Sequence, residues 1–485
     1  MEKYLFSDHN KSRRSFMANL GSIAAGAYLL PHLTWAKGFF EEDIIKPYGP
    51  ASKYTPKLMA IFVRRKEDYG MWWPGQIYDG DAAFKKYREQ ILATGNILNV
   101  DIDIRPKPIY SIEEADTWVT EVKNKKPDGL LVVTLDRQQH TWPTVNKAIE
   151  STIPTVVFSP LGTSFTTNTS KIARKDGAFI CSTDDFSQAA FGIKMIYAGA
   201  KLRETKYLVI KGNERKESEV NHIGTKLHYI PANDFIHEYN SIKSSKLLDQ
   251  LAEELIGQAT DMHGSSEQDV RNGIKSCFVA KNLLERERCD AITMDCLGAL
   301  ADKKISLPCI SWSKMNDCGI PAACEADIGA CVTHALIQYL FDRPGFQQDP
   351  VAETSKECLI GSHCSCPTKL NGFSSSPEPY EIVQHHGLRD ATAKTVWKKG
   401  QRITVADVIL KNEQDKNEMI ISTGTVVENK SIPPSGGCVI APMVKLDNVS
   451  DLLDYPGFHQ IFFYGDYKKE LISYCQLYGI KSVVI

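Results

Sequence analysis

The sequence lacks the glycine-rich signatures that mark nucleotide-binding and serine-hydrolase folds. It contains no Gly-x-x-x-x-Gly-Lys phosphate loop, no Gly-x-Gly-x-x-Gly after its first expected strand, and no Gly-x-Ser-x-Gly turn. Each of these patterns positions a phosphate group or a nucleophile at a strand-to-helix junction. Their absence argues against kinase chemistry and dinucleotide-dependent oxidoreduction.

Excess charge of one sign and long apolar runs are also scarce. The 485 residues carry a formal net charge of −2, which argues against a nucleic-acid partner or a polybasic membrane surface. The longest apolar stretch, from Ala18 to Leu33, is broken by glycines and Pro31 and falls short of the roughly 20 residues of a spanning helix. Low-complexity tracts are absent, and 42% hydrophobic residues suffice for packed cores. We therefore expect no stable membrane insertion of the mature chain.

The N-terminal segment has the features of an export signal. Arg13 and Arg14 precede the apolar stretch, and Ala36 ends a plausible cleavage site. This pattern predicts a twin-arginine signal peptide over residues 1–36, followed by a linker over 37–56, and a periplasmic protein. The twin-arginine route carries folded proteins, often with a cofactor already bound. A single membrane anchor is the alternative interpretation.

Cysteine is abundant, with 13 residues, most of them between Cys277 and Cys366. Disulfides are one interpretation, but folding before export takes place in a reducing compartment. A zinc site is another, although Cys364 and Cys366 are separated by only one residue, and Cys318 and Cys324 are spaced too loosely for the usual motif. We expect most of these thiols to act as small core residues.

Alternating strand and helix patterns predict an α/β fold with two Rossmann-like parallel-sheet domains, over residues 57–165 and 166–350. Continuous apolar runs followed by amphipathic segments are typical of strands covered on both faces. Beyond residue 350, extended segments separated by turns predict a β-rich, barrel-like domain over 351–485 that ends in a helix and a strand. Strands are expected at 58–63, 100–104, 130–135, 155–158, 207–211, 291–295, 395–397, 402–410, 419–428 and 481–485, and helices at 81–93, 111–124, 143–150, 184–199, 241–258, 268–286, 327–341 and 468–478.

Two segments carry residues suited to a hard metal ion. Glu325 and Asp327 lie two residues apart just before an apolar helix, where Asp327 is also a suitable N-cap. Glu325 has no such structural role, and paired carboxylates suit Mn²⁺ or Mg²⁺. His459 lies in an aromatic segment near the C-terminus, where a buried packing role is the alternative.

Further candidates lie in loops. Arg137, His140 and Trp142 follow an expected strand at the edge where parallel sheets bind ligands, and they offer hydrogen-bond donors and an aromatic face for a polyol. Trp72 could add a second stacking surface, unless these segments are ordinary polar loops. His363, within Gly361–Pro367, is a candidate ligand or substrate contact, with a plain domain-junction loop as the alternative.

At these residues the chain resembles the L-fucose isomerase/L-arabinose isomerase superfamily. Glu325-Ala326-Asp327 followed by Gly329-Ala330 is similar to that family's carboxylate segment, and His459 followed by Tyr464-Gly465 is similar to its metal-histidine segment. The resemblance extends remotely over most of the mature chain. The segment around Asp295 matches only weakly.

The resemblance implies an aldose–ketose isomerase that uses Mn²⁺, or Mg²⁺, and an enediol intermediate. It implies Asp327, His459 and Glu325 as metal ligands, a small carbohydrate as substrate and a homo-oligomer. The family's upstream glutamate is missing, and Asp295 is its best substitute, so we expect Asp295 and Glu325 as acid/base residues. A non-catalytic carbohydrate-binding protein of the same fold, or another metal-assisted sugar-modifying enzyme, remains the alternative.

Overall fold

The computed structural model describes residues 45–66, 71–72, 77–137, 139–300, 305–386, 389–433 and 437–485, in two compact units. The first comprises Thr55–Ala200 and Lys469–Ile480, and the second comprises residues 45–54, Lys201–Lys468 and Lys481–Ile485. The predicted signal peptide over 1–36 lies outside the described residues. No helix in the described part of the chain combines the length and apolarity that a membrane crossing requires.

The first unit contains the predicted Rossmann-like parallel sheet. Its strand order is β4-β1-β5-β6-β7, and neighbouring strands pair in parallel throughout. The strands β1, β5 and β6 coincide with the apolar runs of the sequence and are almost wholly buried. The strands are β1 (Lys57–Val63), β4 (Asp101–Ile104), β5 (Gly129–Thr134), β6 (Thr155–Ser159) and β7 (Ala178–Ser182), beside the short pair β2 (Met71–Trp72) and β3 (Ile77–Tyr78).

Helices alternate with these strands, as the pattern predicts. Ser111 caps α4 by accepting a hydrogen bond from the backbone of Glu114, because a hydroxyl satisfies an otherwise unpaired helical N–H group. The helices of this unit's sequence are α3 (Gly80–Leu98), α4 (Ile112–Lys125), α5 (Thr141–Glu150), α6 (Thr166–Thr169), α7 (Ser187–Glu204) and α14 (Lys468–Tyr478).

A second parallel sheet lies in the second unit. Its order is β13-β12-β8-β10-β9, with the first four strands parallel and β9 antiparallel at the edge. The strands are β8 (Lys206–Ile210), β9 (Lys216–Glu219), β10 (Lys226–Ile230), β12 (Ala291–Met294) and β13 (Ala322–Cys324). The helices are α2 (Pro50–Lys53), α8 (Ala232–Ser241), α9 (Lys246–Gln258), α10 (Glu267–Glu287), α11 (Cys296–Leu300), α12 (Cys309–Asp317) and α13 (Ile328–Phe341).

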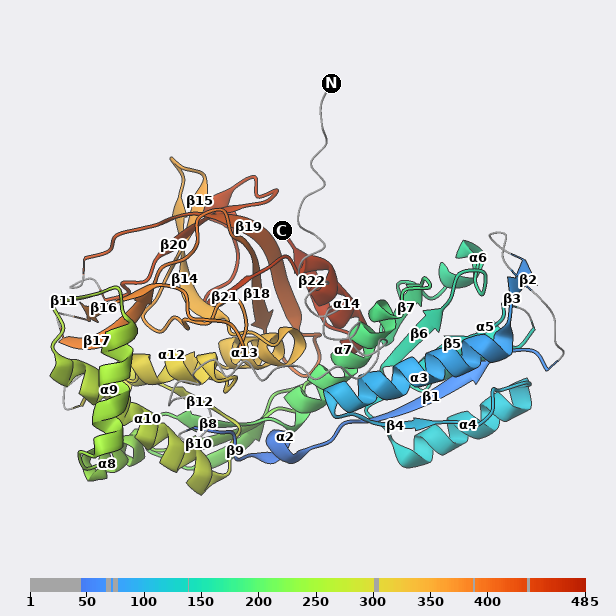
Figure 1. Cartoon of the computed structure of the whole chain (residues 1–485), viewed down its shortest axis with the longest axis horizontal. Helices are drawn as coiled ribbons and strands as arrows, with labels where there is room; N and C mark the ends of the chain where they lie inside the picture. Colours follow the sequence, from blue (N-terminus) through green and yellow to red (C-terminus); the bar gives the residue numbers. More distant parts are fainter. Residues whose placement is uncertain are drawn as a thin grey trace, which may run out of the picture. The chain divides into compact units, whose positions relative to one another are not determined.

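The predicted barrel is present as a closed ring of six antiparallel strands, drawn in orange to red in Figure 1. Its order is β18-β21-β14-β15-β20-β19, and β18 pairs again with β19 to close the ring. Buried aromatic side chains such as Phe346, Trp397 and Phe462 fill it. The strands are β14 (Phe346–Glu353), β15 (Cys358–Ser362), β18 (Arg402–Ile409), β19 (Glu418–Asn429), β20 (Pro442–Leu446) and β21 (Gln460–Tyr464), with β22 (Lys481–Val484) added parallel to β19.

Several predicted elements differ from the structure in their bounds, among them the helices expected at 81–93 and 184–199, which span Gly80–Leu98 and Ser187–Glu204. Two further differences are larger. The helix expected at 241–258 is interrupted, because Ser245 accepts a hydrogen bond from the backbone of Leu248 and caps a new helix, α9. Of the segment expected to be extended at 395–397, only Thr395 lies in a strand, where it is the last residue of a strand of a separate small sheet. That sheet consists of β11 (Asp261–His263), β16 (Tyr380–His385) and β17 (Arg389–Thr395).

The second parallel sheet and the barrel belong to the same compact unit. The predicted boundaries at residues 165 and 350, which divide the chain into three domains, stay a prediction. The carboxyl ends of β12 and β13 form the edge at which parallel sheets commonly bind ligands.

Candidate metal centre

A strained turn connects β13 to α13 and carries the two predicted carboxylates. Glu325 and Ala326 both have left-handed backbones, with φ of 62° and 54°. Asp327 then caps α13, its Oδ1 accepting a hydrogen bond from the backbone of Ala330 at 2.9 Å. A left-handed conformation costs about 1–2 kcal/mol for a residue with a Cβ atom. Such outliers are characteristic of functional sites, where the surrounding structure holds them in place.

His459 reaches this turn from the far end of the sequence. It precedes β21 in a third left-handed conformation, with φ of 54°. Its Nδ1 lies 3.0 Å from Oδ2 of Asp327, and its Nε2 lies 3.4 Å from Oε2 of Glu325. The structure thus brings together the three residues that the sequence nominates as metal ligands.

Two further side chains complete the cluster. Oδ1 of Asp349, on β14, lies 3.2 Å from Nε2 of His459. His363 follows β15, and its Nε2 lies 3.8 Å from Oε1 of Glu325. Ligand atoms of Glu325, His363 and His459 all lie within 4.8 Å of one another. Asp349 is not among the residues nominated from the sequence, and the signal that could have found it is the polar run Gln347-Gln348-Asp349 in a strand whose first three residues are buried.

Several polar atoms of this cluster are buried without a hydrogen bond. They are Nε2 of His363, Nε2 of His459 and Oδ1 of Asp349. Nε2 of His459 and Oδ1 of Asp349 nevertheless form an ion pair with each other at 3.2 Å, whereas the nearest carboxylate oxygen to Nε2 of His363, Oε1 of Glu325, lies 3.8 Å away. Leaving a buried polar atom unpaired costs about 1–3 kcal/mol, so Nε2 of His363 requires an explanation. A cation bound between these side chains would satisfy it. Carboxylate and imidazole ligands fit Mn²⁺, and the carboxylates also fit Mg²⁺.

The cluster has a buried side and an open side. The side chains of His363 and His459 are 1% and 5% exposed, whereas those of Glu325, Asp327 and Asp349 are each about 30% exposed. The imidazoles therefore form a floor and the carboxylates a rim that solvent reaches. This arrangement lets a small molecule approach the carboxylates.

The cluster favours positive charge at its centre. Burial lowers the pKa of His459, but its three carboxylate neighbours outweigh burial and raise that pKa to about 11. Hydrogen bonding to His459 in turn lowers the pKa of Glu325. Burial lowers the pKa of His363 to about 4, so this imidazole is neutral at physiological pH and able to bind a metal. The same field that charges His459 would attract a divalent cation.

Asp407, on β18, is a further carboxylate that sequence analysis missed. Its side chain is buried, and Oδ2 makes no hydrogen bond. Burial, reinforced by the charge of Asp327, raises its pKa to about 7. An acid within the apolar strand segment Val405–Val408 is the signal that could have revealed it.

Asp295, the predicted substitute for the missing glutamate, lies at the same edge of the sheet, and its acid/base role stays a prediction. Met294 pairs with Cys324, so Asp295 and Glu325 follow neighbouring strand ends. The carboxylate of Asp295 accepts a hydrogen bond from the backbone of Gly298 at 3.2 Å, at the start of α11. This contact gives Asp295 a local capping role.

The predicted sugar-binding loop lies in the first unit, and two of its residues point inward. Trp142 is 7% exposed and packs in the hydrophobic core with Trp118. Nε2 of His140 lies 3.0 Å from the backbone oxygen of Arg64. Because both side chains are buried, neither presents a surface to a sugar, and the interpretation of Trp142 as a stacking platform is wrong.

The remaining nominated residues are less informative. Arg137 donates a hydrogen bond to the backbone oxygen of Gly162 at 2.9 Å and stacks over the ring of Phe165. Trp72 lies in β2, and its side chain falls outside the described part of the structure. A better aromatic candidate is Phe458, which is 59% exposed and whose ring centroid lies 4.4 Å from that of His459.

Comparisons with known proteins give little further information. No family model and no curated protein matches the sequence. An ABC transporter solute-binding protein from Burkholderia multivorans aligns at 11% identity, over 60% of this chain and 95% of its own, with a TM-score of 0.18. The sugar-binding protein of a sugar ABC transporter from Bacillus halodurans aligns at 16% identity, over 59% and 88%, with a TM-score of 0.17. At these TM-scores the likeness shows neither a shared fold nor a shared ligand.

Proposed function

We propose that this protein binds a small carbohydrate at a divalent-metal centre and interconverts its aldose and ketose forms. The observation that carries the proposal is the meeting of Glu325, Asp327 and His459, from segments 132 residues apart, beside the buried Nε2 of His363, which makes no hydrogen bond. Mn²⁺ is the proposed ion, with Mg²⁺ as the substitute. The resemblance to the L-fucose and L-arabinose isomerases agrees with this ligand set.

The residues of the chain fit the needs of such a reaction. Asp327, His459 and Glu325 would hold the ion, and the ion would act as a Lewis acid on the sugar carbonyl. Isomerisation also needs a group that moves a proton between adjacent carbons. Glu325 suits this task, because its carboxylate is partly open to solvent and its strained backbone fixes its position.

Asp349 is a candidate to supply the carboxylate that the missing upstream glutamate provides in the family. It reaches the same imidazole as Glu325 and Asp327, at 3.2 Å from Nε2 of His459. The additional carboxylate would then come from β14, downstream of the carboxylate segment, and not from Asp295. We therefore assign Asp349, in place of Asp295, to the proposed catalytic centre.

The exposed ring of Phe458 supports a carbohydrate as the ligand. An aromatic face beside carboxylates supplies both an apolar contact and hydrogen-bond acceptors, which polyols need. Phe458→Ala should weaken sugar binding by roughly tenfold, the order of 1.4 kcal/mol, and leave metal content unchanged. Titration calorimetry with the metal-loaded protein would measure the loss.

Elemental analysis of the purified mature protein tests the metal centre. We expect close to one manganese per chain, lost in Asp327→Ala/His459→Ala and kept in the matched control Asp415→Ala/His237→Ala, whose residues are exposed. The loaded protein would then be screened for ketose formation from aldoses. Folded wild-type protein that takes up neither Mn²⁺ nor Mg²⁺ would refute the proposal.

A second candidate is carbohydrate binding without turnover. The surroundings of His459 favour it, because its carboxylate neighbours in the described part of the chain are Glu325, Asp327 and Asp349 and do not include the predicted acid/base residue Asp295. Under this candidate, sugars bind the metal-loaded protein but no ketose accumulates, and Asp349→Asn leaves sugar affinity unchanged. Under the isomerase proposal, Asp349→Asn abolishes ketose formation.

A further inference from the structure

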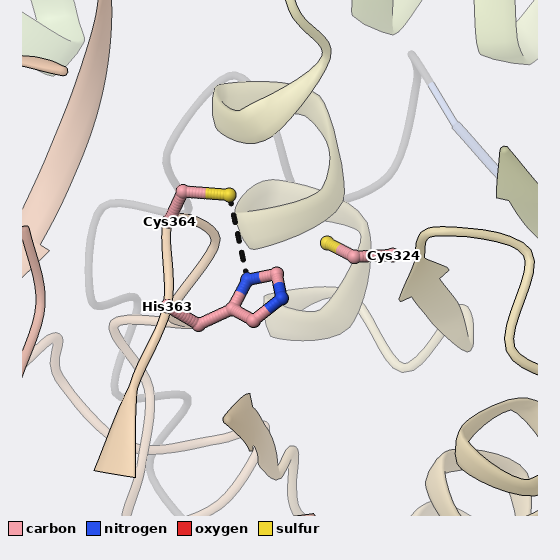
Figure 2. Close-up of side chains that lie close together, drawn as sticks. All are labelled: Cys324, His363 and Cys364. Atoms are coloured by element: carbon pink, nitrogen blue, oxygen red, sulfur yellow. Dashed lines mark hydrogen bonds between the residues drawn. The ribbon is translucent and has the colours of Figure 1, made fainter. Parts of the chain in front are cut away.

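A second, sulfur-rich cluster shares His363 with the carboxylate centre. It consists of Cys324, His363 and Cys364, whose side chains face one another in Figure 2. Their ligand atoms all lie within 4.8 Å of one another. Cys324 ends β13, and the other two residues follow β15, so the sheet and the barrel each contribute to the cluster.

The contacts within the cluster are short, and the side chains are shielded from solvent. Sγ of Cys364 lies 3.4 Å from Nδ1 of His363, the contact marked by a dashed line in Figure 2. Sγ of Cys324 lies 2.8 Å from Oγ of Ser365. Cys324, His363 and Cys364 are only 2%, 1% and 3% exposed. The thiol of Cys309, also buried, interacts with that of Cys364.

We propose that Cys324, His363 and Cys364 bind a thiophilic metal ion, with zinc as the probe of choice, at a site that shares only His363 with the carboxylate centre. Two thiolates and one imidazole are a typical ligand set for zinc, with ligand distances of about 2.0–2.3 Å. The two cysteine thiols release their protons to solvent as the ion binds, so two protons leave for each divalent ion. Cys309 is the nearest further sulfur for a fourth position.

The imidazole of His363 provides an argument beyond the sulfur count. Its Nδ1 faces the thiols, while its buried Nε2 has no hydrogen bond and faces Oε1 of Glu325 at 3.8 Å. A histidine that binds a metal through one ring nitrogen commonly directs the other toward a carboxylate, which fixes the ring. Packing alone would explain buried thiols, but it gives no reason to place a polar ring between them and a carboxylate.

The geometry also distinguishes this site from the zinc motif considered in the sequence. Cys366, two residues beyond Cys364, lies in the core of the barrel, where its thiol contacts the backbone oxygen of Pro367. The partner of Cys364 is instead Cys324, 40 residues earlier. In the structure neither Cys324 nor Cys364 forms a disulfide.

Cobalt substitution tests the site with a readout specific to sulfur. The full-length protein, purified reduced and without chelators, is titrated with Co²⁺ and followed by absorption, because only thiolate ligands give the intense ultraviolet charge-transfer bands. We expect these bands in the wild type and their displacement by equimolar Zn²⁺. The bands should persist in Asp327→Ala/His459→Ala, so that failure of the carboxylate centre leaves this result intact.

Cysteine variants provide the second arm of the test. Cys324→Ser/Cys364→Ser should lose the bands and at least tenfold in zinc affinity, whereas Cys358→Ser, a buried thiol on β15 that contacts the backbone of Lys356, should keep both. Wild-type protein without charge-transfer bands would overturn the proposal, as would bands retained in the double variant or a native Cys324–Cys364 disulfide found by mass mapping. If the double variant does not fold, the wild-type cobalt spectrum decides.

Discussion

At the scale of single residues, Asp327 of the carboxylate centre has two structural roles. Asp327 caps α13 through Oδ1 and meets His459 through Oδ2. Its cap is a structural contribution and its contact with His459 belongs to the site. The two tasks can be separated, because asparagine is as good a cap as aspartate but a much poorer metal ligand.

Asp327→Asn should therefore fold with nearly wild-type stability and bind manganese at least tenfold more weakly. Asp327→Ala should lose the cap as well, at a cost of about 1 kcal/mol in the free energy of unfolding. Chemical denaturation and metal titration of the two variants check this prediction. Equal metal affinity in Asp327→Asn and the wild type would remove Asp327 from the ligand set.

Glu287, far from the centre on α10, predicts a pH dependence of stability. Burial raises its pKa, but hydrogen bonds from Arg215, His228 and Arg286 outweigh burial and lower the pKa from 4.5 to about 2. The unfolded chain therefore takes up this proton first as the pH falls. The stabilisation is complete above pH 4.5 and is lost as the pH falls toward 2.

The variant Glu287→Gln isolates this effect. It should be less stable than the wild type at pH 7, and the difference in unfolding free energy should shrink toward zero between about pH 5 and pH 2. Urea titrations across this range measure the difference. A difference that stays constant with pH would show that the carboxylate does not titrate as described.

At the scale of elements, apolar patterning predicted the strands of the first sheet well. The apolar runs 58–63 and 130–135 became β1 and β5, because a strand covered on both faces is apolar at every position. The interruption before α9 was missed, because a single capping serine, Ser245, decided it. Local sequence describes burial better than it describes where a helix begins.

The residues of the site were predictable only in part, because some of them are brought together by strand pairing in the barrel. Asp327 and His459 lie in local motifs, but the position of Asp349 in the site depends on the register between two strands. Gln348 pairs with Gln460 between β14 and β21, which sets the preceding His459 opposite Asp349. Register between strands more than 100 residues apart leaves no local pattern in the sequence.

At the scale of elements, the packing of helix α12 predicts a loss of stability when its buried tryptophan is truncated. Trp312 is fully buried and meets Phe235 of α8 edge to face, with ring centroids 6.5 Å apart. Trp312→Ala should lower the free energy of unfolding by roughly 3–5 kcal/mol, through lost burial and the cavity that remains. Trp312→Phe, which keeps an aromatic ring, should cost much less. Thermal unfolding of both variants would check the order, and equal costs would contradict it.

At the scale of the whole molecule, the twin-arginine signal and the homo-oligomer stay predictions. The double variant Arg13→Lys/Arg14→Lys tests the signal, because it keeps the positive charge of the segment and removes only the two arginines. We expect the wild-type protein in the periplasmic fraction and nearly all of the variant in the cytoplasm. Cell fractionation checks this, and export of the variant at the wild-type level would argue for another route.

The ligands of the carboxylate centre come from four separate places in the second unit. They lie in the turn before α13, on β14, after β15 and before β21. An ion held there would cross-link the edge of a parallel sheet to a closed barrel through its ligands. Binding to the folded chain alone adds about 2.7 kcal/mol when the free ion is at 100 times its dissociation constant. The melting temperature of the barrel would then report the manganese supply of the compartment in which the protein works.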